Sequence, residues 1–186
     1  EVASNGNTTV SPSGRLGSML SSFQPNIVVV ALGGNDSYGY GSSSQKAKYK
    51  TVLAGYMAAF ESSGELEEVR WFGPSYSSKI RSNGRPYDTI RQKIREHQEE
   101  FASSYSGAAR TTWTSMVPLT RDLQHKEDGT HFVSGERGYG GWGSKMTSES
   151  GPLGDLMAGG TAGSNRVQFA VPAGKVQVTS KPPKGG

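Results

Sequence analysis

One uninterrupted run of apolar residues constrains the fold of this 186-residue chain more than any other feature. Residues 27–32 read Ile-Val-Val-Val-Ala-Leu, and most of them are β-branched. Such a run is typical of a strand buried on both faces, as in a parallel sheet that helices cover from each side. The run ends in the sharp turn Gly33-Gly34-Asn35-Asp36. Because functional loops in open α/β sheets lie at the carboxyl ends of strands, this turn is a candidate site.

Helical and strand patterns alternate after this turn. Apolar residues spaced by three and four predict helices over residues 45–62 and 86–105. Short apolar runs predict a strand over residues 68–72 and a weaker one over residues 111–116. A glycine-rich helix is expected near residues 134–146. This order of elements predicts an α/β domain with three layers, α/β/α, and a mainly parallel sheet.

Composition divides the chain into two parts. Hydrophobic residues make up 33% of the chain, and many of its 26 glycines lie late in the sequence. We therefore expect one domain over residues 1–147, and a Gly/Ser/Pro-rich extension or linker with little core over residues 148–186. Residues 167–178 are compatible with a small hairpin or an edge strand.

Charge and composition narrow the classes of function. The net charge is +4, but lysine and arginine are spread along the chain, so we expect no nucleic-acid partner. Arg91, Lys93 and Arg95 lie close together and predict a solvated helix face; a polyanionic partner such as a cell-wall polymer is the alternative. No apolar run approaches the roughly 20 residues that span a bilayer. The chain has no cysteine, and His, Asp and Glu are too scattered to predict a metal site.

Two short motifs carry groups that could do chemistry. In Asp128-Gly129-Thr130-His131, the carboxylate can accept a hydrogen bond from one imidazole nitrogen while the other nitrogen takes a proton. Asn35 can aim an amide N–H group at a developing oxyanion. Each motif alone also has a simpler interpretation, an exposed turn for the first and an Asx turn for the second. Of the other histidines, we expect His97 to pack on its helix or to lie at the boundary of the core, and His125 to be solvated, with proximity to the site as the alternative.

Taken together and in order, these parts resemble the SGNH hydrolases, the family of GDSL-like lipases, esterases and acetylesterases. The strand ending in Gly-Asn-Asp is similar to the third block of the family, and Asp-Gly-Thr-His-Phe, followed by Tyr139 and Trp142, is similar to the fifth. The strand that ends in Gly73-Pro74 lies between them. The resemblance covers about residues 2–147 and implies a flavodoxin-like sheet.

The resemblance implies a role for individual residues. His131 would be the general base and Asp128 the partner that orients it. Asn35 would be an oxyanion-hole donor, together with the backbone N–H group of Gly6, for which Gly14 is the alternative. No cofactor is implied.

The family's nucleophile motif is the main departure. Gly-Asp-Ser does not occur in these 186 residues. We therefore expect the first strand and the nucleophilic serine to lie upstream of Glu1, on a separate fragment of the same precursor or on a longer chain; the alternative is that catalysis has been lost. Ser37 and Ser75 are more typical of loop hydroxyls than of substitutes. Tyr38 and Tyr40 could line a substrate cleft or lie on a surface loop.

These observations predict an SGNH-type serine ester hydrolase that removes acyl or acetyl groups, for example from polysaccharide or peptidoglycan. The alternative is an inactive, SGNH-like structural or carbohydrate-binding module of a larger virion or cell-surface assembly. Either function favours a secreted, cell-surface or virion-associated protein.

Overall fold

A computed structural model describes residues 14–34, 36, 43–62, 64–158 and 169–170. Five of the residues singled out above lie outside these described residues: Gly6, Asn35, Ser37, Tyr38 and Tyr40. Their predicted roles remain predictions. Gly14, the alternative to Gly6, is the first residue of a helix.

The sheet is parallel throughout its described part, as the sequence predicted. Its strands are β1 (Ile27–Ala31), β2 (Glu68–Phe72), β3 (Arg110–Thr114) and the two-residue β4 (Phe169–Ala170). They lie in the order β3-β2-β1-β4, and every neighbouring pair is parallel. The register places Val30 opposite Trp71, and Trp71 opposite Trp113. The predicted strand positions are therefore confirmed, except that β3 ends at Thr114 and not at Met116.

The helices are α1 (Gly14–Phe23), α2 (Ser43–Glu61), α3 (Asp88–Ser104), α4 (Val117–Thr120), α5 (Tyr139–Thr147) and α6 (Gly154–Ala158). The predictions of α2 and α3 are confirmed to within two residues at each end. The sequence did not predict α1, α4 or α6. α5 begins at Tyr139 and not near Ser134, because Gly135 has a φ of 76° that a right-handed helix cannot contain.

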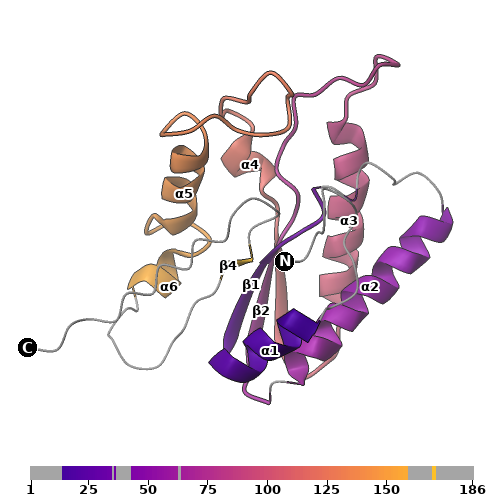
Figure 1. The fold of residues 1–186 in the computed structure, drawn as a ribbon, viewed down its shortest axis with the longest axis vertical. Helices are drawn as coiled ribbons and strands as arrows, with labels where there is room; N and C mark the ends of the chain where they lie inside the picture. The colour runs from indigo at the N-terminus through magenta and orange to yellow at the C-terminus, as the bar shows by residue number, and fades with distance from the viewer. Residues whose placement is uncertain (1–13, 35, 37–42, 63, 159–168, 171–186) are drawn as a thin grey trace, which may run out of the picture.

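Each face of the sheet is covered by a different set of helices. On one face, Val30 and Trp71 pack against α2 and α3, and Leu20 of α1 joins the same cluster. On the other face, Val29 and Phe72 pack against side chains of α4, α5 and α6. Side chains alternate between the faces because successive residues of a strand point in opposite directions. Figure 1 shows the two groups of helices on opposite sides of the strands, an arrangement compatible with three α/β/α layers.

Packing continues beyond residue 147, where the sequence predicted little core. Leu153 is only 1% exposed and belongs to the second cluster. Arg70 of β2 forms an ion pair with Asp155 of α6 (2.6 Å) and another with Glu68 (3.0 Å). Composition alone did not indicate these contacts. The assignment of residues 148–186 to a separate extension stays a prediction.

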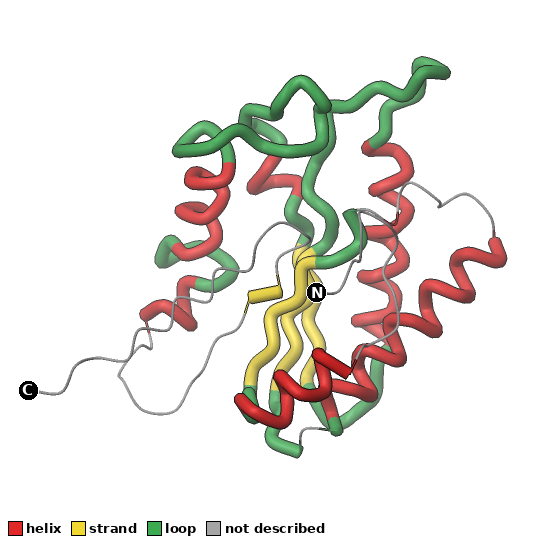
Figure 2. The backbone as a smooth tube through the Cα atoms, in the orientation of Figure 1, coloured by secondary structure: helices red, strands yellow, loops and turns green. Residues whose placement is uncertain are grey.

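The loops after β2 and β3 gather at the carboxyl ends of the strands, as Figure 2 shows. The end of β1 at the same edge is fixed by α3, because Nε2 of Gln98 donates to the carbonyl of Leu32 (3.0 Å). Gly33 follows with a φ of 101°, and a Cβ atom there would lie 2.8 Å from that same nitrogen. Glycine is therefore required at this turn. None of the helices in the described ranges is both long and apolar enough to span a bilayer.

Candidate active site

Asp128 and His131 form a hydrogen-bonded pair, as the sequence predicted. Oδ2 of Asp128 lies 2.5 Å from Nδ1 of His131, and Oδ1 accepts the backbone N–H groups of Thr130 (2.8 Å) and His131 (2.9 Å). The bond to the imidazole, followed by the two backbone bonds, holds the pKa of the Asp128 carboxyl group well below its usual range. The carboxylate is therefore ionised at neutral pH and favours a proton on Nδ1 of His131.

The opposite nitrogen of this imidazole is open to solvent. The His131 side chain is 62% exposed, and its Nε2 atom has no hydrogen-bond partner among the described residues. With Nδ1 carrying the proton, Nε2 has a lone pair directed outward. This geometry lets His131 accept a proton from a hydroxyl group placed against it.

The turn that creates the pair depends on Gly129. Its φ is 63°, and a Cβ atom at this position would lie 2.7 Å from the backbone N and Cα of Lys79. The N–H group of Gly129 donates to the carbonyl of Lys126 (2.9 Å), and the N–H group of Lys126 donates to the carbonyl of His131 (2.7 Å). The turn is thus both left-handed and in direct contact with the loop after β2, so that glycine is needed on both grounds.

His125 connects this turn to the loop after β2, so the prediction that it is solvated is wrong and the alternative, proximity to the site, is confirmed. The residue is half-buried and pairs with Phe132 in an isolated bridge. Its Nε2 atom lies 3.2 Å from the carbonyl of Tyr76, to which the N–H group can donate. Its ring contacts both Tyr76 (5.9 Å between centroids) and Phe132 (4.7 Å). The sequence around His125 is charged and did not indicate this packing. Tyr76 comes from a distant part of the chain, and Phe132 from the opposite side of the turn.

Phe132 fixes the other side of the turn to α5. It is buried, and its ring lies 5.5 Å from that of Tyr139 and 6.0 Å from that of Trp142, between centroids. The neighbour of His131 is therefore anchored in an aromatic cluster.

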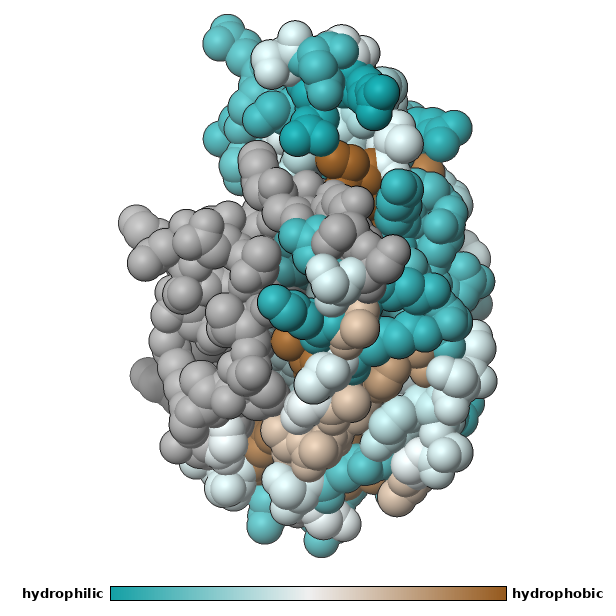
Figure 3. Space-filling model, turned by 90° about the vertical axis from the view of Figure 1, so that its right-hand side faces the viewer, coloured by the Kyte–Doolittle hydropathy of each residue, from teal (hydrophilic) through white to brown (hydrophobic). Residues whose placement is uncertain are grey.

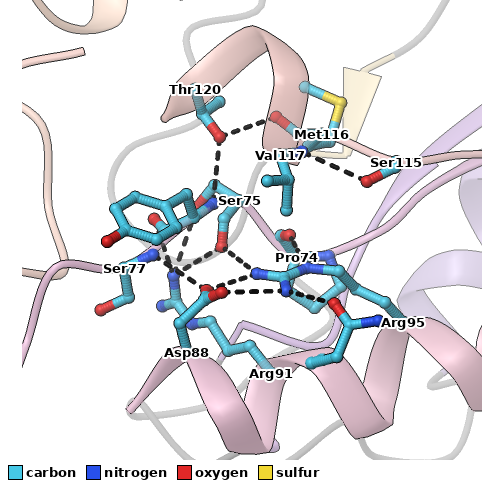
Figure 4. A network of polar contacts seen from close by, with 12 residues as sticks. Pro74, Ser75, Ser77, Asp88, Arg91, Arg95, Ser115, Met116, Val117 and Thr120 are labelled. Atoms are coloured by element: carbon cyan, nitrogen blue, oxygen red, sulfur yellow. Dashed lines mark hydrogen bonds and ion pairs between the residues drawn. The ribbon is translucent and has the colours of Figure 1, made fainter. Parts of the chain in front are cut away.

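The loop after β2 supports the pair directly, and the polar network in Figure 4 holds this loop in place. The hydroxyl of Ser77 donates to the carbonyl of Gly129 (2.7 Å), and the backbone N–H group of Ser77 donates to Oδ1 of Asp88 (3.1 Å). The N–H group of Tyr76 donates to the hydroxyl of Thr120 in α4 (3.0 Å). The loop is therefore held from α3 and from α4 while it holds the turn.

Two buried arginines of α3 complete this support. Arg95 donates from Nε to the carbonyl of Pro74 (2.9 Å) and from Nη2 to Asp88 (2.5 Å). Nη1 of Arg91 donates to the carbonyl (3.0 Å) and the hydroxyl (3.3 Å) of Ser75. The Ser75 hydroxyl thus accepts a hydrogen bond from a guanidinium group, which fits the prediction that it is a loop hydroxyl.

The prediction of a solvated helix face is wrong for these two residues. Arg91 and Arg95 are 3% and 2% exposed, whereas Lys93 is exposed. The buried face of α3 consists of residues 91, 94, 95, 98 and 102. These buried residues are spaced by three and four, as on any helix face. Most of them are polar, so a search for apolar residues at that spacing did not find this face.

Arg91 also joins the ends of β1 and β2. A Cβ atom on Gly34 would lie 3.7 Å from Nη2 of Arg91, while Nη1 of Arg91 binds Ser75. Gly34 directly precedes Asn35, the predicted oxyanion-hole donor, which lies outside the described residues. The structure therefore brings together Asp128 and His131, and leaves the predicted contributions of Asn35 and Gly6 as predictions.

Among the residues that the structure describes, no group of three or more His, Cys, Asp or Glu side chains is arranged to hold a metal ion. Comparison of the chain with family models, with curated proteins and with solved structures finds no match.

Proposed function

We propose that this domain supplies the histidine–aspartate half of an SGNH-type ester hydrolase site. One observation carries the proposal: an ionised Asp128 carboxylate binds Nδ1 of His131, and Nε2 of His131 faces solvent with no partner among the described residues. The parallel sheet and the position of the loops at the carboxyl ends of its strands support an α/β hydrolase of this kind.

The reaction would be acyl transfer from an alcohol to water. A serine hydroxyl attacks the ester carbonyl while Nε2 of His131 takes its proton, and Asp128 stabilises the resulting imidazolium. Asn35 and the N–H group of Gly6 would hold the oxyanion. His131 then returns the proton to the leaving alcohol, and a water molecule, deprotonated by the same nitrogen, releases the acid from the acyl-serine.

The serine in this scheme would belong to a Gly-Asp-Ser segment, a motif that the 186 residues do not contain. The substrate class is small acyl or acetyl esters, carried for example by a polysaccharide or by peptidoglycan. Asp128 does not itself have to take a proton, because a carboxylate that stays ionised is sufficient to orient the imidazole.

A serine-reactive fluorophosphonate probe tests the proposal on natively purified protein. Denaturing intact-mass spectrometry then identifies which polypeptide carries the label. We expect the label on a Gly-Asp-Ser serine of an accompanying polypeptide or of a longer form of this chain. Ester hydrolysis should fall by about 10³-fold or more in His131→Ala, as for other members of a serine–histidine unit. His97→Gln, which changes a histidine of α3, is the matched control and should hydrolyse at the normal rate.

Two outcomes would contradict the proposal. Hydrolysis that survives His131→Ala would show that another group is the base. A natively purified protein that has neither an accompanying polypeptide nor any labelled serine would favour the alternative, a structural or carbohydrate-binding module.

A further inference from the structure

A basic hairpin leaves the loop after β2 and returns to α3. We call residues 78–86 the basic arm; its sequence, Ser-Lys-Ile-Arg-Ser-Asn-Gly-Arg-Pro, contains three cationic residues and no acidic one. Ile80 pairs with Pro86, the N–H group of Arg81 donates to the carbonyl of Arg85 (2.9 Å), and the side chain of Asn83 accepts the N–H group of Arg85 (3.2 Å). These bonds involve the backbone of both arginines, so the turn orders Arg81 and Arg85 without using their guanidinium groups.

The basic arm starts at the Asp128–His131 turn. The N–H group of Lys79 donates to the carbonyl of Gly129 (3.1 Å), which also accepts the hydroxyl of Ser77. The N–H group of Tyr87 donates to the carbonyl of Lys79 (2.9 Å) and closes the base of the arm. In Figure 1 the arm projects from the same end of the molecule as the loops after β3. The base of the arm therefore lies beside the turn that carries His131.

The two arginines of the arm carry charges that no described carboxylate compensates. Arg81 and Arg85 are exposed, and neither forms an ion pair or a side-chain hydrogen bond within the described ranges. Some other cations lie against carboxylates, as in Lys145–Asp122 (2.7 Å) and Lys50–Glu100 (2.6 Å). The upper end of the molecule in Figure 3 is mainly hydrophilic on the side shown. Two uncompensated guanidinium groups on an ordered turn favour an anionic ligand, because each can bind a carboxylate through two parallel hydrogen bonds.

Ile80 narrows the class of ligand. Its side chain is 59% exposed between the cationic residues Lys79 and Arg81. An apolar side chain beside guanidinium groups suits a ligand that combines anionic groups with apolar C–H surface. A sugar ring that bears a carboxylate has both, whereas a polyphosphate chain has only the charge.

We propose that the basic arm binds the carboxylate groups of an acidic polysaccharide, and so presents an acyl ester on that polysaccharide to His131. The second half of this proposal rests on the proposed function, and the first half does not. Arg81 and Arg85 would contribute affinity and would take no part in the chemical steps.

Binding to polygalacturonate oligomers, measured by calorimetry on the full chain, tests the proposal. The double variant Arg81→Gln/Arg85→Gln should bind about tenfold more weakly, as expected for the loss of two exposed charge pairs. Lys48→Gln/Lys93→Gln is the matched control, because it removes the same charge from two exposed residues of α2 and α3. The control should bind within about twofold of the unmodified chain, since charges beyond the screening distance contribute little. A neutral galactan should not bind.

Several results would overturn the proposal. These are no binding of polygalacturonate, an equal loss of affinity in both double variants, or binding of inorganic polyphosphate in place of polygalacturonate. His131→Ala separates the proposal from the proposed function, because it should abolish hydrolysis and leave binding unchanged. If hydrolysis depends on His131 and binding does not depend on the arm, the arm proposal alone fails. If binding depends on the arm and no hydrolysis exists, the proposed function alone fails.

Discussion

The Asp128–His131 turn and the buried layer that supports it, which contains Arg91 and Arg95, differ most in their exposure to solvent. The side chains of His131 and Asp128 are 62% and 45% exposed, whereas those of Arg91 and Arg95 in the supporting layer are almost completely buried. The exposed pair makes its hydrogen bonds within four consecutive residues. The buried arginines bond to residues 74–76, which lie 15 to 21 residues earlier in the sequence, and these bonds depend on the tertiary fold.

The chemical properties of the pair and its position in the fold therefore depend on different residues. The short turn sets the ionisation of Asp128 and the orientation of His131 by itself, because every group involved is local. The place of the turn relative to the sheet is set by Ser77, His125 and the arginines of α3. We therefore expect changes in the buried layer to reduce stability, and changes in the exposed pair to reduce activity with little loss of stability. The following variants test this in order of the expected decrease in the free energy of unfolding.

Arg95→Ala should have the largest effect. It leaves the Asp88 carboxylate without its nearest cation and the Pro74 carbonyl without a donor. Removing one partner of a buried ion pair typically costs about 3–5 kcal/mol. Chemical denaturation measures this loss, and Lys93→Ala, an exposed change on the same helix, should cost under about 0.5 kcal/mol. Equal losses of unfolding free energy in the two variants would show that the buried arginine does not stabilise the fold more than the exposed lysine does.

Gly129→Ala should be the next largest. The new methyl group would have to enter a left-handed conformation and would lie 2.7 Å from the backbone of Lys79. The two effects together should cost about 2–4 kcal/mol. Gly135→Ala is the matched control, since Gly135 has a φ of 76° but no heavy atom within 4 Å of a new Cβ. It should lose only the conformational part, about 1–2 kcal/mol. If both variants lose the same amount, the contact between the turn and Lys79 contributes nothing.

Ser77→Ala should have a smaller effect. It removes the hydroxyl that donates to the carbonyl of Gly129, but that carbonyl still accepts the N–H group of Lys79. A loss of about 1 kcal/mol is expected. Ser78→Ala, at the exposed neighbouring position, should be neutral. In a hydrolytically competent protein, an unchanged activity in Ser77→Ala would show that this bond does not position the pair.

Acidification should have the smallest effect on the exposed pair. The pKa of Asp128 is lower in the folded protein than its ordinary value of about 3.9. Its stabilising contribution is therefore complete above pH of about 4 and is lost as the pH falls toward the lowered pKa. Because the carboxylate is exposed, solvent screening should keep this contribution below about 1 kcal/mol. Melting temperatures between pH 7 and pH 2.5 measure it, and Asp128→Asn should show a weaker acid dependence than the unmodified chain. A dependence identical in both would place the acid-labile interactions elsewhere, for example at the Arg70–Asp155 pair, in which the pKa of Asp155 is lowered to about 2.

Local sequence patterns determined the strands, the two long helices and the Asp128–His131 pair. A continuous run of valines such as Val28–Val30 indicates a strand that is covered on both faces. The turn of Asp128 is closed by residues within three positions of it. Such features depend on neighbours in the sequence, so they can be predicted without knowledge of the fold.

The tertiary structure alone decided which polar residues are buried. Arg91, Arg95 and His125 lie in charged stretches and were expected to be solvated, but each finds partners in the loop after β2. The burial of Leu153 beyond the predicted domain boundary has the same origin, since β1, β2 and α5 supply its surroundings. Burial depends on what the rest of the chain places opposite a residue. A buried cation becomes stable when carbonyl and carboxylate oxygens from distant segments surround it, and this arrangement cannot be read from the cation's own stretch of sequence.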